Sequence, residues 1–370
     1  MVRPFDVSKF RNSLTKSIQG ISVGFDSDPD TWISTGNYTL NHLISGDFER
    51  GIPLGRVTML AGESGSGKSL IASGNIIRNA QKQGIFCVAL DSENALHETW
   101  LQDLGVDTSD DKLLRINVAM VDDVAKIISD FITNYKKDYQ DKPQEERPKV
   151  LFVIDSLGML LTPTDRDQFE KGDMKGDMGR KPKALASLVR NTVNQIAPFP
   201  IGIVATNHTY ASQDMFDPDD KISGGQGFIY ASSIVIAMKK LKLKEDADGN
   251  KVTTVQGIRA GCKVMKTRYS KPFESVQVKI PYETGMDPYS GMVEMLEAKG
   301  ILEKVGNKLS YVSPITGEEI KEFRKGWTGD KLEIVMDEFG QNPNKDNDVQ
   351  DDIDIVELDN SNEEDLIDES

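Results

Sequence analysis

The stretch RVTMLAGESGSGKSLIASG, residues 56–74, decides the fold of this chain. It begins as an apolar run typical of a buried strand, passes through a loop rich in glycine and serine, and continues in a helix-like pattern. The loop, Gly62-Glu63-Ser64-Gly65-Ser66-Gly67-Lys68-Ser69, has the spacing GxxxxGK[ST]. Glycines at this spacing let backbone N–H groups surround a phosphate. The sequence therefore predicts a nucleoside triphosphate site between a strand and a helix.

Three residues have the chemistry for the phosphates and their metal ion. Lys68 is expected to neutralise the β- and γ-phosphates, and the Ser69 hydroxyl is expected to bind Mg²⁺. A second strand-like run, KVLFVIDS at residues 149–156, ends in Asp155. We expect its carboxylate to orient the same Mg²⁺, the alternative being a helix cap.

Further apolar runs define the fold class. They read IFCVALD, KVLFVIDS, IGIVATN and SSIVIAM. Helix-like stretches lie between RVTMLAG and IFCVALD, between IFCVALD and KVLFVIDS, and between KVLFVIDS and IGIVATN. Runs that are apolar almost throughout are typical of strands buried on both faces of a parallel sheet. After Ile234, KVTTVQGIRAGCKVMKTRYS and ESVQVKIPYET predict hairpin-connected strands at a sheet edge. The chain is therefore expected to be an α/β protein with a mostly parallel central sheet.

Polar residues follow two of the predicted strands. Glu93 comes just after IFCVALD, together with Asp91, and Asn207-His208 ends IGIVATN. Ligands of open α/β sheets sit beyond the carboxyl ends of the strands, so these residues are expected beside the phosphate loop. We expect Glu93 to orient the attacking water and His208 to sense the γ-phosphate. The alternatives are a surface cap for Glu93 and a structural role for His208.

The distribution of charge predicts the domain organisation. The formal net charge is −15, but residues 346–370 contain twelve Asp or Glu and no Lys or Arg, which leaves 44 basic against 47 acidic residues elsewhere. Such a segment cannot bury enough apolar surface to fold alone. It serves either as a solubility tail or as a competitor for a basic surface of its own protein. The expected parts are an N-terminal arm (1–35), an ATPase core (36–285), a small α+β unit (286–345) and a disordered acidic tail (346–370).

Several classes of protein are excluded. No stretch of about 18 apolar residues occurs, so no membrane partner is expected. No secretory signal is recognisable at the N-terminus, and a cytoplasmic location is the default. Cys87 and Cys262 have no second Cys or His at metal-ligand spacing, so neither a disulfide framework nor a zinc site is expected.

Two segments near this site are predicted to be irregular. Thr162 to Lys183 carries several cations and glycines, and basic flexible segments can follow a phosphate backbone; a solvated loop is the alternative. Thr209 to Gly227 is too polar and too rich in Gly and Asp for a strand or helix. Loops of that length inside a compact domain are usually functional.

Together these motifs resemble the RecA-type homologous recombinases. The resemblance covers roughly residues 33–300 and rests on ISTGNYTLNHLISGDFERGIPLGRVTMLAGESGSGKS, LDSENALHETWLQDLGVD, FVIDSLGML, ATNHTY and GGQGFIYASSIVIAMKK. His208 stands where cellular RecA proteins have glutamine. With NHTYASQDMF and the acidic tail, it makes the chain most similar to the recombinases of T-even-type bacteriophages. The implied fold is a RecA-like P-loop ATPase core.

The resemblance implies ATP and Mg²⁺ as cofactors and assigns further residues. Leu70 joins the ATP-binding loop, and Trp100 stacks on adenine unless it is a core aromatic. Lys266 and Arg268 match two cations that reach across a filament interface to the neighbour's ATP, which makes hydrolysis depend on assembly. The two irregular segments match DNA-binding loops, and the candidate DNA contacts are Lys183, Arg190, Met215, Phe216, Gly224 and Gly225.

The implied function is ATP-dependent strand exchange in recombination, repair and recombination-dependent replication. The implied partners are single-stranded DNA, a homologous duplex, further copies of the chain in a helical filament, a recombination mediator and a single-strand-binding protein. Two alternatives remain. One is a ring-forming motor of the replicative-helicase type, although such proteins usually add an N-terminal domain larger than a 35-residue arm. The other is a mediator that binds nucleotide without hydrolysing it.

Overall fold

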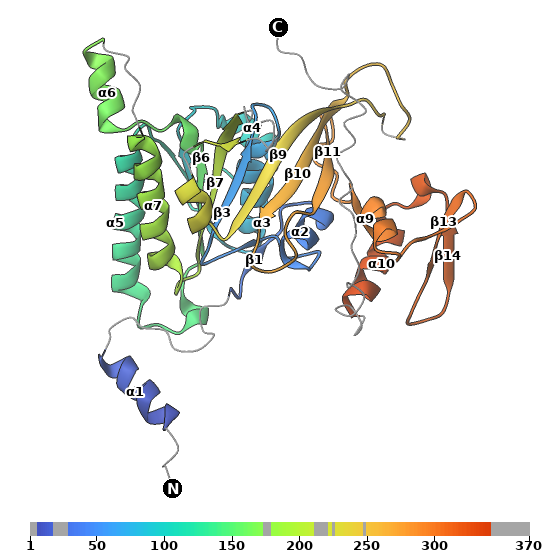
Figure 1. The fold of residues 1–370 in the computed structure, drawn as a ribbon, viewed down its shortest axis with the longest axis horizontal. Coiled ribbons are helices and arrows are strands. Elements are labelled where there is room, and N and C mark those ends of the chain that lie inside the picture. The colour runs from blue at the N-terminus through green and yellow to red at the C-terminus, as the bar shows by residue number, and fades with distance from the viewer. Residues whose placement is uncertain are drawn as a thin grey trace.

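A large sheet forms the centre of the molecule (Figure 1). The computed structural model describes residues 6–17, 29–172, 179–210, 221–223, 226–246 and 249–341. Over these ranges the sheet has nine strands. They are β3 (Val57–Gly62), β4 (Phe86–Asp91), β5 (Leu113–Asn117), β6 (Val150–Asp155), β7 (Ile201–Tyr210), β8 (Lys221–Ile222), β9 (Ile234–Leu243), β10 (Gly257–Lys266) and β11 (Ser275–Pro281).

The strand order confirms the predicted α/β class. It is β11-β10-β9-β3-β7-β6-β4-β5, and the short β8 pairs with β7. The strands from β9 to β5 in this order pair in parallel. β10 and β11 pair antiparallel at one edge, as the sequence predicts. β5, at the other edge, is missed by the sequence analysis because Leu114 and Arg115 are exposed and the run is not continuously apolar.

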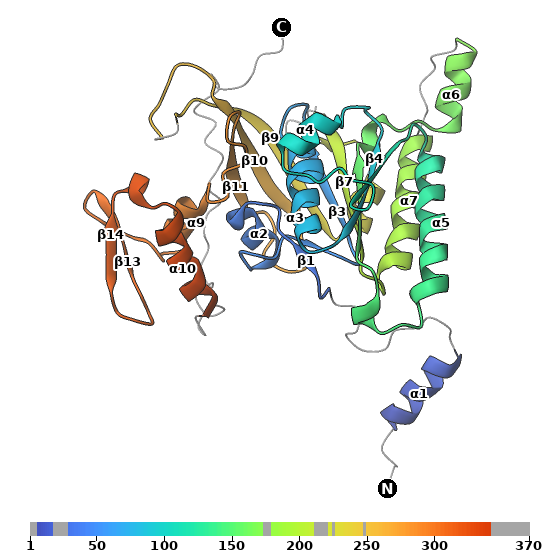
Figure 2. The same cartoon turned by 180° about the vertical axis from the view of Figure 1, so that it is seen from behind.

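Helices cover both faces of the sheet (Figures 1 and 2). One face packs against α2 (Tyr38–Ser45), the π-helix η1 (Leu70–Ile76), α3 (Ile77–Lys82) and α4 (Glu98–Asp103). The other packs against α5 (Val121–Tyr139), α7 (Arg180–Ile196) and α8 (Gln226–Ala231). In α5 the buried side chains recur every three or four residues, at Val121, Val124, Ile128, Ile132 and Tyr135. No helix among the described residues is both long and apolar enough to span a membrane.

The segment predicted to be irregular from Thr162 to Lys183 contains a helix, α6 (Pro163–Glu170). A capping box starts it: the Asp165 N–H donates to Thr162 Oγ1 at 3.3 Å, and the Thr162 N–H donates to Asp165 Oδ2 at 2.7 Å. Proline at the first helical position adds a fixed φ that suits a helix. The prediction is therefore wrong for these residues, and α7 also begins inside the segment, at Arg180.

The segment from Thr209 to Gly227 is also more regular at its described ends than predicted. β7 continues through Tyr210 and pairs antiparallel with β8, Thr209 opposite Ile222. α8 begins at Gln226. The prediction overlooked cross-strand pairing, which supplies hydrogen bonds to a polar backbone whatever the side chains are.

The C-terminal part contains helices and strands that share their own hydrophobic cluster. It contains α9 (Met292–Ala298), β12 (Glu303–Val305), β13 (Lys308–Val312), β14 (Glu319–Glu322) and α10 (Gly329–Gln341). Phe48, from the loop after α2, joins this cluster and lies 5.9 Å from the Phe339 ring. The two hydrophobic units are therefore in contact.

The N-terminal elements are short. α1 (Val7–Ser17) lies apart from the sheet in both views (Figures 1 and 2). β1 (Trp32–Ile33) pairs with β2 (Ile52–Pro53), so residues that the sequence analysis placed in the arm pack with the core. The acidic tail, residues 346–370, lies outside the described residues.

Candidate functional site

The phosphate loop, residues 62–69, lies between β3 and the helix that follows it. Gly65 and Gly67 have φ values of 75° and 94°, a region that side chains with a Cβ rarely adopt. The Ser66 hydroxyl is buried and has no hydrogen-bond partner among the described residues. An unpaired buried donor beside glycines that expose their N–H groups fits a bound phosphate.

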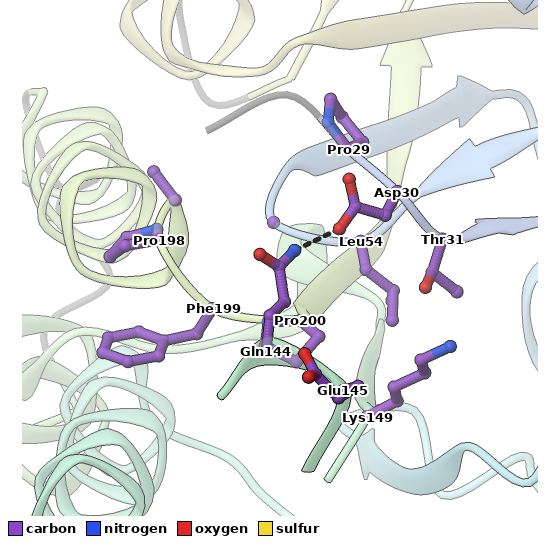
Figure 3. Close-up of a pocket in the computed structure, with 12 residues that line it drawn as sticks. Pro29, Asp30, Thr31, Leu54, Gln144, Glu145, Lys149, Pro198, Phe199 and Pro200 are labelled. Atoms are coloured by element: carbon purple, nitrogen blue, oxygen red, sulfur yellow. Dashed lines mark hydrogen bonds between the residues drawn. The ribbon is translucent and has the colours of Figure 1, made fainter. Parts of the chain in front are cut away.

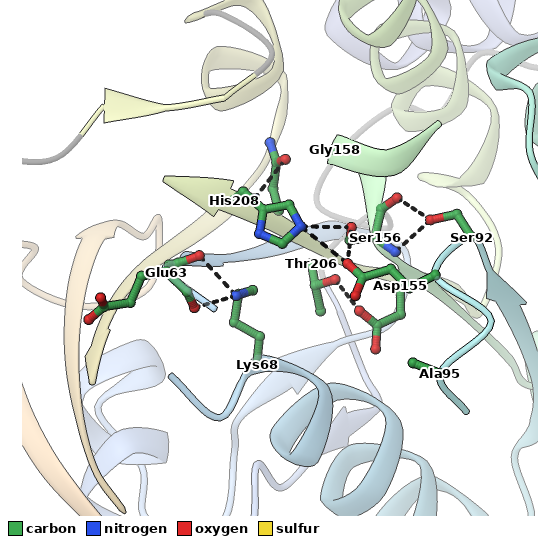
Figure 4. A network of polar contacts seen from close by, with 12 residues as sticks. Glu63, Lys68, Ser92, Ala95, Asp155, Ser156, Gly158, Thr206 and His208 are labelled. Atoms are coloured by element: carbon green, nitrogen blue, oxygen red, sulfur yellow. Dashed lines mark hydrogen bonds and ion pairs between the residues drawn. The ribbon is translucent and has the colours of Figure 1, made fainter. Parts of the chain in front are cut away.

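Lys68 points back into this loop (Figure 4). Its Nζ donates to the carbonyl oxygens of Gly62 at 2.9 Å and Glu63 at 2.7 Å. Burial lowers the pKa of the Lys68 ammonium, while the carboxylates of Glu93 and Asp155 act in the opposite direction. The ammonium therefore sits in a poorly solvated place, where its attraction to a phosphate is stronger than in water.

Asp155, the last residue of β6, is buried under the loop. Its Oδ1 accepts a hydrogen bond from Thr206 Oγ1 at 2.5 Å, and its Oδ2 accepts one from Ser73 Oγ at 3.2 Å. Burial raises the pKa of the Asp155 carboxyl, while hydrogen bonds from Thr206 and Ser69 lower it. The contact with Ser69 brings together the two groups that the sequence predicts for Mg²⁺, and their oxygens suit that ion.

The side chains of Glu93, Ser156 and His208 meet near the carboxyl ends of β4, β6 and β7, and Figure 4 shows Ser156 beside His208. Glu93 Oε1 accepts a hydrogen bond from Ser156 Oγ at 2.6 Å and lies 3.2 Å from His208 Nε2. Ser156 Oγ is 3.4 Å from the same ring nitrogen. The Glu93 and His208 side chains are 31% and 35% exposed, so water reaches them. The sequence analysis missed Ser156, although it directly follows Asp155.

His208 pairs with the first residue of the phosphate loop, and its backbone is hydrogen-bonded to the segment that follows β7. It pairs with Gly62 across β7 and β3. The His208 carbonyl accepts a hydrogen bond from Ser223 N–H at 2.9 Å, and the Asn207 side chain donates to the Ser223 carbonyl at 2.6 Å. A displacement of His208 would therefore move the base of the predicted DNA-binding loop.

Trp100 and Leu70 both pack against the core cluster on the same face of the sheet. Trp100 lies on α4 and is partly buried, and Leu70 is the first residue of η1. Part of the Trp100 ring is therefore buried against the core. Its role in stacking on adenine stays a prediction.

Lys266 and Arg268 lie toward the opposite end of the strands from the phosphate loop. Lys266 pairs with Val235 at the start of β9, and the start of β9 pairs with the start of β3. Val235 in turn pairs with Met59, and the phosphate loop begins three residues further along β3, at Gly62, or about 10 Å along the strand. Lys266 Nζ donates to the carbonyl oxygens of Ile229 at 3.1 Å and Tyr230 at 2.8 Å, at the end of α8, and Arg268 is exposed. In this structure Lys266 is therefore engaged at the end of α8 and not at the phosphate loop.

The candidate DNA contacts are only partly described. Lys183 and Arg190 are exposed on α7 and seven residues apart, so they share one face of that helix. Lys183 lies in the first turn of α7, two residues after Lys181, whose Nζ donates to the Gly158 carbonyl beyond β6. The remaining candidates, Met215, Phe216, Gly224 and Gly225, lie outside the described residues.

A cavity of about 310 Å³ opens at the amino ends of the parallel strands (Figure 3). Its walls come from the segment before β1, the loop before β6 and the loop before β7, and include Leu54, Lys149 and Phe199. None of the predicted site residues lines it. The candidate site is therefore the polar cluster at the carboxyl ends of the strands.

Comparison with known proteins agrees with this geometry. The chain matches the RecA N-terminal domain family over residues 23–287. It is 28% identical over 294 residues to the recombination and repair protein of Enterobacteria phage T4, covering 78% of this chain and 69% of that protein. It is 25% identical over 285 residues to Protein RecA of Cutibacterium acnes, covering 75% and 74% of the two chains. Protein RecA of Chlorobium chlorochromatii is 24% identical over 294 residues, with coverage of 79% and 76%.

Proposed function

This chain belongs to the RecA N-terminal domain family, and on that premise we propose that it is an ATP-dependent DNA recombinase. It assembles as a filament on single-stranded DNA and promotes pairing with a homologous duplex. The observation that carries the proposal is the separation of the phosphate loop from Lys266 and Arg268 along β3. Because these two cations lie toward the other end of the strands, a neighbouring copy of the chain supplies its own Lys266 and Arg268 to the ATP site. Repeated contacts of that kind between copies build a filament.

The proposed hydrolysis uses the residues gathered at the carboxyl ends of the strands. Lys68 and the loop N–H groups hold the β- and γ-phosphates, and Ser69 and Asp155 hold Mg²⁺, which neutralises part of the phosphate charge. Glu93 accepts a proton from a water molecule while the water oxygen attacks the γ-phosphorus. The bond between the γ-phosphorus and the oxygen that bridges it to the β-phosphate breaks. Ser156 and His208 both contact Glu93 Oε1, so Oε2 is the oxygen that would face this water.

The proposed coupling to DNA runs through His208. Its ring contacts Glu93, and its backbone holds the strand pair that carries residues 211–220. A γ-phosphate that changes the position of Glu93 would displace His208 and, with it, the base of that segment. DNA affinity would then depend on whether the γ-phosphate is present. Partner proteins such as a recombination mediator remain an expectation from the family.

The first test is the rate of ATP hydrolysis with and without single-stranded DNA over a range of protein concentrations. We expect strong stimulation by DNA that rises cooperatively with protein concentration, because a neighbour supplies Lys266 and Arg268. A rate indifferent to both variables would contradict the proposal. Electron micrographs of the same samples separate the ring-motor alternative, which gives closed rings in place of filaments on DNA.

Mixing two inactive variants tests whether the cations act on a neighbour. Glu93→Gln has a defective ATP site but intact cations, and Lys266→Ala has an intact site but lacks one cation. We expect each variant alone to be nearly inactive on DNA. An equimolar mixture should recover about one quarter of the wild-type rate, because random neighbours place an intact site beside an intact cation at one interface in four. No recovery, with both variants still bound to DNA, would show that Lys266 does not act in this way.

A further inference from the structure

Asp91 is a buried carboxylate that the proposed chemistry does not use. It is the last residue of β4, and its exposed fraction is 0%. Its Oδ1 accepts hydrogen bonds from the backbone N–H groups of Glu93 at 3.2 Å and Ala95 at 3.3 Å. Its Oδ2 accepts one from the N–H of Leu96 at 3.1 Å. The loop that carries Glu93 is therefore wrapped around a single carboxylate.

These hydrogen bonds hold a loop conformation that is unfavourable on its own. Asn94, in the middle of the loop, has a φ of 54°, in the left-handed region that is uncommon for residues other than glycine. Such a residue keeps its conformation only where its surroundings determine it. Here the surroundings include the three N–H groups that converge on Asp91, on both sides of Asn94.

Arg115 compensates the charge of Asp91. It lies on the neighbouring edge strand β5, and its Nη2 and Nε donate to Asp91 Oδ2 at 2.7 Å and 3.2 Å. The Arg115 side chain is 36% exposed, so it covers the carboxylate from the solvent side. A buried carboxylate that loses its cation is strongly destabilised, and it relieves this by moving toward water. Such a movement would disturb the three loop hydrogen bonds.

The position of this loop decides where the Glu93 carboxylate lies. The backbone of Glu93 is held by Asp91, and its Oε1 meets Ser156 Oγ at 2.6 Å. Ser92 joins the same loop to Ser156 by two hydrogen bonds, of 2.6 Å to its carbonyl and 2.8 Å from its N–H. A displacement of a reacting group by 1 Å can lower a rate by about 100-fold.

We propose that Arg115 is a positioning residue for ATP hydrolysis, which holds the Glu93 loop in place through the buried Asp91 carboxylate. The proposal rests on the function proposed above for Glu93. Arg115 itself contacts Asp91 and does not reach the phosphate loop in the described structure. Arg115 therefore affects the orientation of Glu93, the proposed general base, and the residues of the phosphate loop bind the nucleotide.

The kinetic test compares Arg115→Met, Arg115→Lys and the control Lys112→Met, which removes a cation whose nearest acidic partner is 3.9 Å away at the surface. We expect Arg115→Met to lower kcat by about tenfold or more while KM for ATP changes by less than about twofold. Arg115→Lys should recover most of the rate, and Lys112→Met should match the wild type. An unchanged kcat in Arg115→Met, or a rise in KM that accounts for the whole loss, would overturn the proposal.

Amide hydrogen exchange tests the same proposal without any measurement of hydrolysis. In the nucleotide-free Arg115→Met protein, the N–H groups of Glu93, Ala95 and Leu96 should exchange at least about tenfold faster than in the wild type. Protection elsewhere in β4 and β6 should be retained. Unchanged exchange at these three positions would overturn the proposal for Arg115, whether or not the wild type hydrolyses ATP. Absence of ATP hydrolysis in the wild type would contradict only the proposed function.

A second variant keeps the test decisive if Arg115→Met does not fold. The double variant Asp91→Asn with Arg115→Met removes both charges, so no uncompensated carboxylate is buried. The amide of asparagine retains one oxygen to accept loop hydrogen bonds. We expect this protein to fold, with loop exchange faster than in the wild type and a reduced kcat. Wild-type exchange and kcat in the double variant would show that the pair does not position the loop.

Discussion

Lys68→Ala is expected to lower the rate of ATP hydrolysis by about 10³-fold or more, because it removes the positive charge aimed at the β- and γ-phosphates. The fold should survive. The Lys68 ammonium lies in a site where burial lowers its pKa, and its two acceptors are backbone carbonyls of the same loop. Its removal gives up these hydrogen bonds but also relieves the burial of a charge. We expect the free energy of unfolding to change by no more than about 2 kcal/mol.

The measurement is steady-state hydrolysis with saturating single-stranded DNA, together with urea unfolding followed by circular dichroism. Lys82→Ala is the matched control, because Lys82 is exposed at the end of α3 on the helix that continues from the phosphate loop. The control should hydrolyse ATP at the wild-type rate. A folded Lys68→Ala protein with normal hydrolysis would refute the assignment of this loop as the ATP site.

Glu93→Gln is expected to lower kcat by about 10² to 10⁴-fold, since the amide cannot take a proton from water. Glutamine has almost the same shape, and its carbonyl oxygen can still accept the hydrogen bond from Ser156. The affinity for ATP should therefore change little. The variant should also stay on single-stranded DNA longer than the wild type, because the γ-phosphate that favours DNA binding is not removed.

Fluorescent-nucleotide binding and single-turnover hydrolysis separate the two effects in this variant. Glu98→Gln is a suitable control, since Glu98 is an exposed carboxylate five residues later, at the start of α4. A loss of ATP binding as large as the loss of hydrolysis would mean that Glu93 acts in binding. Unchanged hydrolysis would assign the base to another residue.

Sequence patterns predicted those features that depend on one strand or one loop. Each strand of the parallel part except the edge strand β5 contains an apolar run, and the phosphate loop has a fixed spacing. The residues at strand ends could be placed together because parallel strands point their carboxyl ends the same way. That argument brought Lys68, Glu93, Asp155 and His208 to one edge before the structure did.

Contacts between elements were beyond the reach of the sequence. The Asp91–Arg115 pair joins residues 24 positions apart on neighbouring strands, and no periodic pattern marks such a pair. The location of Lys266 depends on the direction of β10, which follows from the strand order and not from the apolar pattern. α6 escaped because its eight residues are mostly polar and none is buried, so only its capping residues signal a helix.

The strand order has a consequence for synthesis of the chain on the ribosome. β3, which carries the phosphate loop, is made before every other strand of the large sheet, but its two neighbours are β7 and β9. Gly62 can therefore pair on one side only after His208 has been synthesised, and on the other side only after Met238 has been synthesised. Pairing of segments so distant in the chain is slow. The emerging chain thus displays an apolar strand without partners until most of the core has been translated, and nucleotide cannot assist folding before that point.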